Sequence, residues 1–116
     1  MRIGVDLDGT LAHYTGYAGP NTIGPLLPGA REWLEAMVKA QHTLIIFTAR
    51  GNDPEGVAAT LKWIETEKLG HLIAGVTGEK LYSFDLFLDD RAVRFEGAYP
   101  EVAVIEATRP WWTAHK

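Results

Sequence analysis

The sequence predicts an α/β fold with a mostly parallel central sheet. Short apolar runs, such as Arg2 to Leu7 and Leu44 to Phe47, alternate with stretches whose apolar side chains recur at helical spacing. This alternation of strands and helices is typical of a parallel sheet covered by its connecting helices. We therefore expect one domain, residues 1–116, built as a three-layer, Rossmann-like sandwich.

The first half of the chain predicts two strands, a loop and a helix. Residues 2–7 form a short apolar run with β-branched side chains, which indicates a buried strand. Residues 9–28 are rich in Gly, Pro, Tyr and Thr and have no regular periodicity, so we expect a long loop. In residues 28–41 the apolar side chains recur at i, i+3, i+4, i+7 and i+8, behind Pro28, which predicts an amphipathic helix. Residues 44–47 are wholly apolar, as in a central parallel strand that is buried on both faces.

The second half predicts another helix and three further strands. Asp53 is a good N-cap and Pro54 a good first helical residue, so we expect a helix that ends near Gly70. The remaining apolar runs are short enough to be strands. They span residues 71–76, 84–90 and 101–107.

The composition disfavours several classes of function. A net charge of −4 provides no basic surface for broad electrostatic binding of nucleic acid. The chain has no cysteine, which excludes disulfides, thiolate catalysis and Cys-ligated zinc. No apolar stretch approaches the ~18 residues of a membrane-spanning helix, and Met1 and Arg2 lead straight into a strand-like run rather than a signal sequence. We expect a cytoplasmic protein without a membrane partner.

Polar side chains stand where three of the predicted strands end. Asp6 and Asp8 follow the first strand, Thr48 follows the second, and Asp89 and Asp90 end a later one. The carboxyl ends of parallel strands share one edge of a sheet, so we expect these side chains to converge there. The first two aspartates could also be ordinary turn residues before a glycine. A converging acidic cluster needs a divalent cation, and oxygen ligands without cysteine or suitably spaced histidine favour Mg²⁺.

A carboxylate site with bound Mg²⁺ is suited to phosphoryl transfer. The cation neutralises phosphate charge and lets an aspartate approach as nucleophile, while a second aspartate moves the proton. The phosphate oxygens also need donors and a cation. Thr48 offers a hydroxyl, and Lys80, shortly before the last acidic strand, offers the cation.

On these residues the chain resembles the haloacid dehalogenase-like (HAD) superfamily of Mg²⁺-dependent phosphohydrolases. "DLDGT", which begins at Asp6, is similar to the nucleophile motif of that family, and Thr48 in "IIFTAR" to the second motif. Lys80 is a candidate for the third motif, and "LFLDDR" resembles the acidic fourth motif. The four counterparts occur in the family's order between Val5 and Arg91.

The resemblance implies a role for each aspartate. Asp6 is the expected nucleophile and Asp8 the general acid and base. The expected Mg²⁺ ligands are the Asp6 carboxylate, the Asp8 backbone carbonyl and Asp90, with Asp89 orienting the metal's water ligands or sharing the site. The reverse assignment of Asp89 and Asp90 remains open.

The resemblance also implies how phosphate and substrate are held. Thr48, the backbone N–H of Ala49, and Lys80 are the expected phosphate-binding groups. Other side chains near the motifs are possible substrate contacts: His13, Tyr14 and Arg50.

The family's cap domain has no counterpart here, since residues 9–28 fill its place with an active-site loop. Capless members of the family act on large substrates such as polymer ends, or borrow a cap from a neighbouring subunit, so a homo-oligomer is possible. We expect a Mg²⁺-dependent phosphatase that hydrolyses a phosphomonoester through an aspartyl-phosphate. The alternatives are a nucleotidase or polynucleotide 3′-phosphatase, and a catalytically silent protein that binds phosphate or Mg²⁺ in regulation. Trp111 and Trp112 must pack back on the domain or against a partner.

Overall fold

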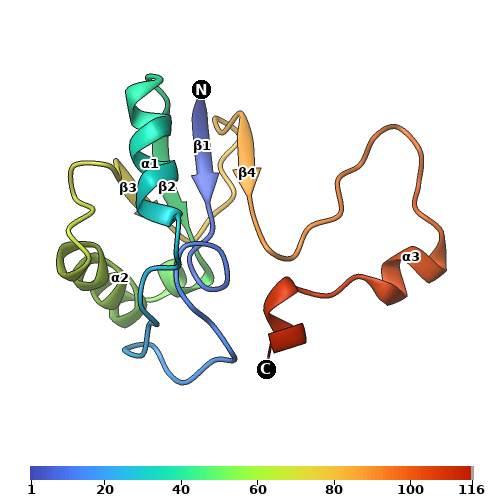
Figure 1. Cartoon of the computed structure of the whole chain (residues 1–116), viewed down its shortest axis with the longest axis horizontal. Coiled ribbons are helices and arrows are strands. Elements are labelled where there is room, and N and C mark those ends of the chain that lie inside the picture. Colours follow the sequence, from blue (N-terminus) through green and yellow to red (C-terminus); the bar gives the residue numbers. More distant parts are fainter. Residues whose placement is uncertain (116) are drawn as a thin grey trace.

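A sheet of four parallel strands forms the centre of the protein, whose computed structural model describes residues 1–115 (Figure 1). The strand order is β3-β2-β1-β4, so β1 lies between β2 and β4. The prediction of a parallel sheet is confirmed. The strands are β1 (Arg2–Val5), β2 (Thr43–Phe47), β3 (Gly75–Thr77) and β4 (Leu86–Leu88).

Helices α1 (Ala30–Lys39) and α2 (Pro54–Thr66) connect the first three strands and pack on one face of the sheet. The chain steps from β1 to β2 to β3 in one direction, so right-handed crossovers bring both helices to the same side. One core cluster joins this sheet face to both helices. Its members include Ile3, Val5, Leu44 and Ile46 of the sheet, Leu34 of α1, and Trp63 and Ile64 of α2.

Two details of these elements follow from local sequence. The Asp53 side chain accepts a hydrogen bond from the backbone N–H of Gly56 at 2.8 Å, which caps α2 as predicted. The strand predicted over residues 71–76 is observed as β3, which begins only at Gly75. The start is later because Leu69 and Leu72 are buried in a turn that precedes β3.

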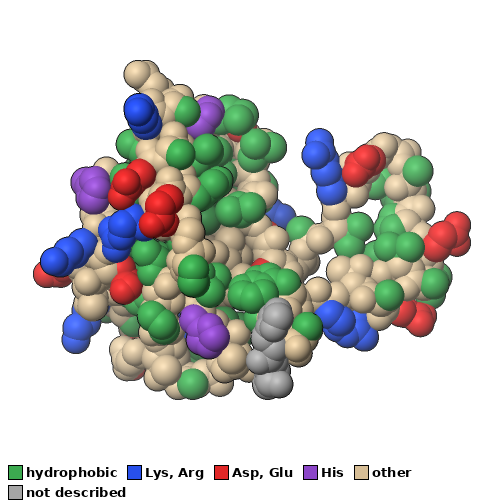
Figure 2. Space-filling model, viewed as in Figure 1, with side chains coloured by type: hydrophobic (Ala, Val, Ile, Leu, Met, Phe, Trp, Pro, Cys, Tyr) green, Lys and Arg blue, Asp and Glu red, His purple; other side chains and the backbone are tan. Residues whose placement is uncertain are grey.

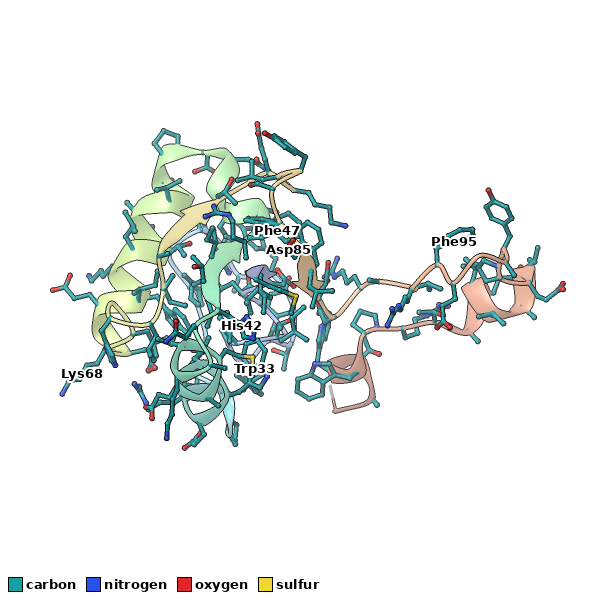
Figure 3. All side chains as sticks on the ribbon, turned by 90° about the horizontal axis from the view of Figure 1, so that it is seen from above. Trp33, His42, Phe47, Lys68, Asp85 and Phe95 are labelled. Atoms are coloured by element: carbon teal, nitrogen blue, oxygen red, sulfur yellow. The ribbon has the colours of Figure 1, made fainter. Side chains whose placement is uncertain are left out.

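The opposite face of the sheet differs from the prediction of three layers. The connection from β3 to β4 lies on this face, because it crosses the sheet in the reverse direction, and residues 78–85 contain no helix. Phe84 from this connection packs directly on Gly4 of β1, and its ring meets Phe87 edge-on, 5.3 Å between centroids. Trp33 of α1 and Phe47 of β2 mark the two sides of the sheet (Figure 3). Within residues 1–115 the sandwich has two layers, because a connection this short has no room for a crossover helix.

The prediction of a strand over residues 101–107 is wrong, because this segment forms helix α3 (Val102–Ala107). The segment lies on an exposed arm, residues 91–109, that extends from β4 away from the sheet (Figure 1). A strand here would leave its backbone groups without a neighbouring strand, whereas a helix pairs them locally, as in the bond from Ile105 N–H to the Glu101 carbonyl. Apolar side chains remain on the arm's surface (Figure 2), and Val102 is 70% exposed.

Residues 9–28 form the predicted loop, with only isolated bridges, for example between Ala12 and Leu26. After the arm, the 3₁₀ turn η2 (Trp111–His115) returns to the ends of the central strands (Figure 1). Of the helices within residues 1–115, none has the length and apolar character needed to cross a membrane.

Candidate functional site

A cavity of about 410 Å³ opens at the carboxyl ends of the central strands. The end of β1 meets the ends of both β2 and β4, since β1 lies between them. The polar residues that follow these strands are therefore neighbours, although they are far apart in the sequence. The cavity is lined by Asp6, Asp8, Tyr14, Tyr17, Phe47, Thr48, Ala49, Arg50, Asp53, Asp89 and Arg91.

Asp6, Asp89 and Asp90 form an acidic cluster at this edge. Each offers a carboxylate oxygen, and the three oxygens lie within 4.8 Å of one another. Asp90 Oδ1 is buried and has no hydrogen-bond partner among residues 1–115. An unpaired buried carboxylate oxygen beside two other carboxylates is costly without a cation. The donor set is oxygen only, which fits a hard divalent ion such as Mg²⁺.

The carboxyl of Asp6 is strongly perturbed in this cluster. Burial, together with the adjoining carboxyl of Asp90, raises its pKa from 3.8 to about 8. The negative charge of Asp89 acts in the same direction, and the backbone N–H of Leu7 partly opposes it. A cation held by the cluster would favour the ionised form and lower this pKa again.

Asp8 lies in the same cavity and is paired with Arg50. Its Oδ2 accepts from Arg50 Nε at 2.7 Å, and its Oδ1 accepts from Nη2 at 3.2 Å. The same guanidinium donates to three backbone carbonyls of the loop, those of Gly19, Pro20 and Thr22, at 2.8 to 3.0 Å. All five N–H donors of Arg50 are thus engaged within the protein.

Arg50 is expected from the sequence to be a possible substrate contact, but the structure gives it a different role. The side chain is only 4% exposed, and it joins Asp8 to the loop. A signal was present in the sequence, since an arginine two residues beyond Thr48 stands at the sheet edge where Asp8 also stands. A buried guanidinium is favoured by a carboxylate partner, and Asp8 provides it here.

Thr48 and Ala49 lie in the cavity wall, as expected of phosphate-binding groups. Thr48 is 2% exposed and forms the N-cap of the 3₁₀ turn η1 (Ala49–Asn52). Its Oγ1 accepts a hydrogen bond from the backbone N–H of Arg50 at 3.2 Å. The hydroxyl proton of Thr48 can therefore be donated to another acceptor, such as a phosphate oxygen.

Lys80 is not brought into the cavity. Its side chain is exposed on the second face of the sheet, with Nζ 4.7 Å from the ring centroid of Phe87. Phe87 in turn meets Phe47, which does line the cavity, edge-on at 5.8 Å. Among the described residues, the cations in the cavity wall are Arg50 and Arg91.

The possible loop contacts divide into two groups. Tyr14 lines the cavity. His13 is exposed and, within the part of the chain that the structure describes, is not among the residues that line it. Tyr17 of the same loop also lines the cavity, with its ring centroid 5.3 Å from Arg50 Cζ.

The two C-terminal tryptophans pack back on the domain, which is one of the two outcomes expected for them. Trp112 is 8% exposed, and its Nε1 donates to Asp90 Oδ2 at 2.7 Å. Trp111 is 48% exposed and donates from Nε1 to the Gly9 carbonyl at 2.6 Å. The sequence did not indicate that Trp112 contacts the acidic cluster, because the exposed arm separates the two along the chain.

The fold is similar to that of a solved bacterial protein. No protein-family model matches this chain, and no curated protein matches it. The structure of a conserved protein from Bacteroides thetaiotaomicron superposes with a TM-score of 0.59 and 27% sequence identity, over 90% of this chain and 85% of that one. The chain is thus an α/β protein with a four-stranded parallel sheet and a structural neighbour of that bacterial protein.

Proposed function

We propose that this protein is a HAD-like, Mg²⁺-dependent phosphatase that hydrolyses a phosphomonoester through an aspartyl-phosphate. The observation that carries the proposal is the cluster of Asp6, Asp89 and Asp90, because two of its members, Asp6 and Asp89, line the cavity that also contains Asp8 and Thr48. A turn that merely ends β1 would need neither the acidic cluster nor the neighbouring hydroxyl.

The acidic cluster is the proposed metal centre. Asp6 and Asp90 would hold Mg²⁺ through their carboxylates and Asp8 through its backbone carbonyl, with Asp89 orienting water ligands. When bound, the ion supplies the positive charge that lets a carboxylate and a phosphate dianion approach each other.

Asp6 and Asp8 perform the two proposed chemical steps. A carboxylate oxygen of Asp6 attacks phosphorus, the ester P–O bond breaks, and the acid form of Asp8 gives its proton to the leaving oxygen. The ionised Asp8 then takes a proton from water, which attacks the same phosphorus and breaks the Asp6–phosphate bond. Inorganic phosphate and the acid form of Asp8 result.

The pairing of Asp8 with Arg50 supports its role in the second step. Both Asp8 oxygens accept hydrogen bonds from the guanidinium, which is the pattern of the ionised carboxylate. In this state Asp8 is the base that activates water. The first step requires the acid form, in which the proton occupies a lone pair that the guanidinium does not use.

The phosphate oxygens are held by groups in the cavity wall. Thr48 donates its hydroxyl proton and Ala49 lies beside it at the start of η1. Lys80 remains the family's candidate cation, although the rings of Phe87 and Phe47 lie between it and the cavity. Arg91 lines the cavity directly and is the alternative cation.

The cavity wall also favours the nucleotidase or polynucleotide 3′-phosphatase alternative. Tyr14, Tyr17 and Phe47 place three aromatic rings around the cavity. Rings of this kind stack on nucleobases with little dependence on sequence. The volume of about 410 Å³ suits a small molecule or one terminal nucleotide.

A substrate screen tests the proposal. Phosphate release would be measured with Mg²⁺ over nucleotides, sugar phosphates and 3′-phosphorylated oligonucleotides, and again with a chelator. We expect Mg²⁺-dependent release from at least one class, and faster release from nucleotides if the aromatic rings bind a base. Binding of Mg²⁺ and phosphate without any turnover would favour the silent regulatory protein.

A further inference from the structure

The C-terminal turn η2 reaches the acidic cluster through one hydrogen bond. The indole Nε1 of Trp112 donates to Asp90 Oδ2 at 2.7 Å, and the side chain is 8% exposed. The other oxygen, Asp90 Oδ1, is buried and has no hydrogen-bond partner within residues 1–115. The indole therefore engages one oxygen of Asp90, and the other oxygen remains available to a cation bound by the cluster.

This contact depends on close packing around the indole. Gly9 has a φ of +84°, and a Cβ there would collide with Asp90 Oδ2 and lie 2.8 Å from Trp112 Cδ1. Tyr14 meets the indole edge-on, with 4.9 Å between ring centroids. The Arg91 guanidinium carbon lies 5.8 Å from the centroid of the same indole. The indole thus packs against Gly9, Tyr14 and Arg91 while its N–H donates to Asp90.

The chain reaches this position by a long route. Residues 91–109 between Asp90 and η2 are exposed and make no part of the core. Nearness in sequence therefore does not bring Trp112 to the cluster. Its own contacts hold it there.

An indole N–H is well suited to orienting a carboxylate ligand. It only donates, so it can engage Asp90 Oδ2 but cannot compete with it for a cation. Ligating carboxylates are commonly fixed by such an outer hydrogen bond, and losing the partner typically lowers metal affinity by about 10- to 100-fold.

We propose that Trp112 is a positioning residue of the metal centre: its N–H holds Asp90 through Oδ2 and leaves Oδ1, which has no other partner within residues 1–115, for a cation that Asp6, Asp89 and Asp90 would share. This inference rests on the proposed metal centre but not on phosphatase turnover. The C-terminal turn thereby completes a site whose ligands come from the ends of β1 and β4.

Terbium(III) luminescence tests the proposal, with Mg²⁺ as the competing ion. Tb³⁺ binding at the cluster is followed by emission under direct excitation of the ion, so the readout does not depend on the indole that the variant removes. Trp112→Phe keeps an aromatic ring but loses the N–H, so we expect an affinity at least about 10-fold weaker, for Tb³⁺ and for Mg²⁺ in competition. Trp111→Phe is the matched control, and we expect its affinity to stay within about 2-fold of the wild type.

Wild-type affinity in a folded Trp112→Phe protein would overturn the proposal, as would the absence of any metal binding by the wild type. Metal binding that requires Trp112 in a protein without turnover would sustain this proposal while refuting the proposed phosphatase. If Trp112→Phe does not fold, the wild-type chain still provides a test. The indole ¹H–¹⁵N resonance of Trp112, assigned with Phe variants of the other tryptophans, should shift on saturation with Mg²⁺, and an unmoved resonance would contradict the proposal.

Discussion

At the scale of single residues, the buried guanidinium of Arg50 ties Asp8 to the loop over residues 9–28. Its five hydrogen bonds go to one carboxylate and three backbone carbonyls. The loop over residues 9–28 therefore depends on the same charge that orients the proposed general base.

Replacing Arg50 tests this connection. Arg50→Ala leaves a carboxylate and three carbonyls without their donor, so we expect the free energy of unfolding to fall by about 3–5 kcal/mol. Arg50→Lys keeps the charge but loses the planar fork, and we expect an intermediate loss. Urea denaturation measures both, with Arg94→Ala on the exposed arm as a control that should change stability by less than about 0.5 kcal/mol. An unchanged stability in Arg50→Ala would show that the guanidinium is not buried as described.

The raised pKa of Asp6 predicts how the metal-free protein responds to pH. Because its pKa is about 8 in the folded protein and near 3.8 when unfolded, the folded state binds an extra proton between these values. Its stabilising contribution is therefore complete below about pH 4 and is lost as pH rises through about 8. We expect the melting temperature in a chelator to fall between pH 5 and pH 8, and Mg²⁺ to raise it more at pH 8 than at pH 6. Asp6→Asn should flatten this pH dependence, and an equally steep profile in that variant would assign the effect to another group.

At the scale of elements, sequence patterns predicted the parts whose contacts are local or strongly periodic. The cap at Asp53, the amphipathic α1 and the apolar β2 follow from residues within one element. Helix α3 could not be predicted in this way, because a short apolar run fits a strand or a helix equally well and the absence of a neighbouring strand decided the outcome.

The predicted site shows the same division. The convergence of Asp6, Asp8, Thr48 and the later aspartates follows from the topology of a parallel sheet, which the sequence does indicate. The distance of Lys80 from the cavity depends on how residues 78–85 cross the second face, and no periodic pattern encodes that path. The contact of Trp112 with Asp90 joins segments 22 residues apart through an exposed arm, so sequence spacing gave no sign of it.

The contrast between α1 and α3 gives a second prediction on stability. Leu34 of α1 is fully buried in the core, whereas Val102 of α3 is 70% exposed. We expect Leu34→Ala to lower the free energy of unfolding by about 2–5 kcal/mol through the cavity it leaves. Val102→Ala should change it by less than about 0.5 kcal/mol. Urea denaturation compares the two, and a large loss in Val102→Ala would mean that α3 is covered in solution, for instance by a second copy of the chain.

At the scale of the whole molecule, the chain consists of a packed unit up to β4 and an exposed arm that returns through η2. The arm carries no core residue, yet it delivers Trp112 to the acidic cluster. The integrity of the arm is therefore expected to matter for metal binding more than for the stability of the sheet.

Limited proteolysis tests this division. Trypsin should cut first after Arg91 or Arg94, because both are exposed on the arm, whereas Arg50 is buried. Mass spectrometry identifies the cut, and Tb³⁺ titration of the nicked protein should show weakened binding once the C-terminal peptide dissociates. First cuts within residues 1–88 would contradict the described packing.

The central claim is that Asp6 is the nucleophile of a Mg²⁺-dependent phosphatase, and Asp6→Asn tests it most directly. Phosphate release would be compared between wild type and variant, on the best substrate from the screen, with Mg²⁺ and with a chelator. We predict that the chelator abolishes release by the wild type. We also predict that Asp6→Asn lowers kcat by at least about a thousandfold while the circular dichroism spectrum stays native, because an amide cannot replace the attacking carboxylate. Wild-type turnover in a folded Asp6→Asn protein with Mg²⁺ present would contradict the account.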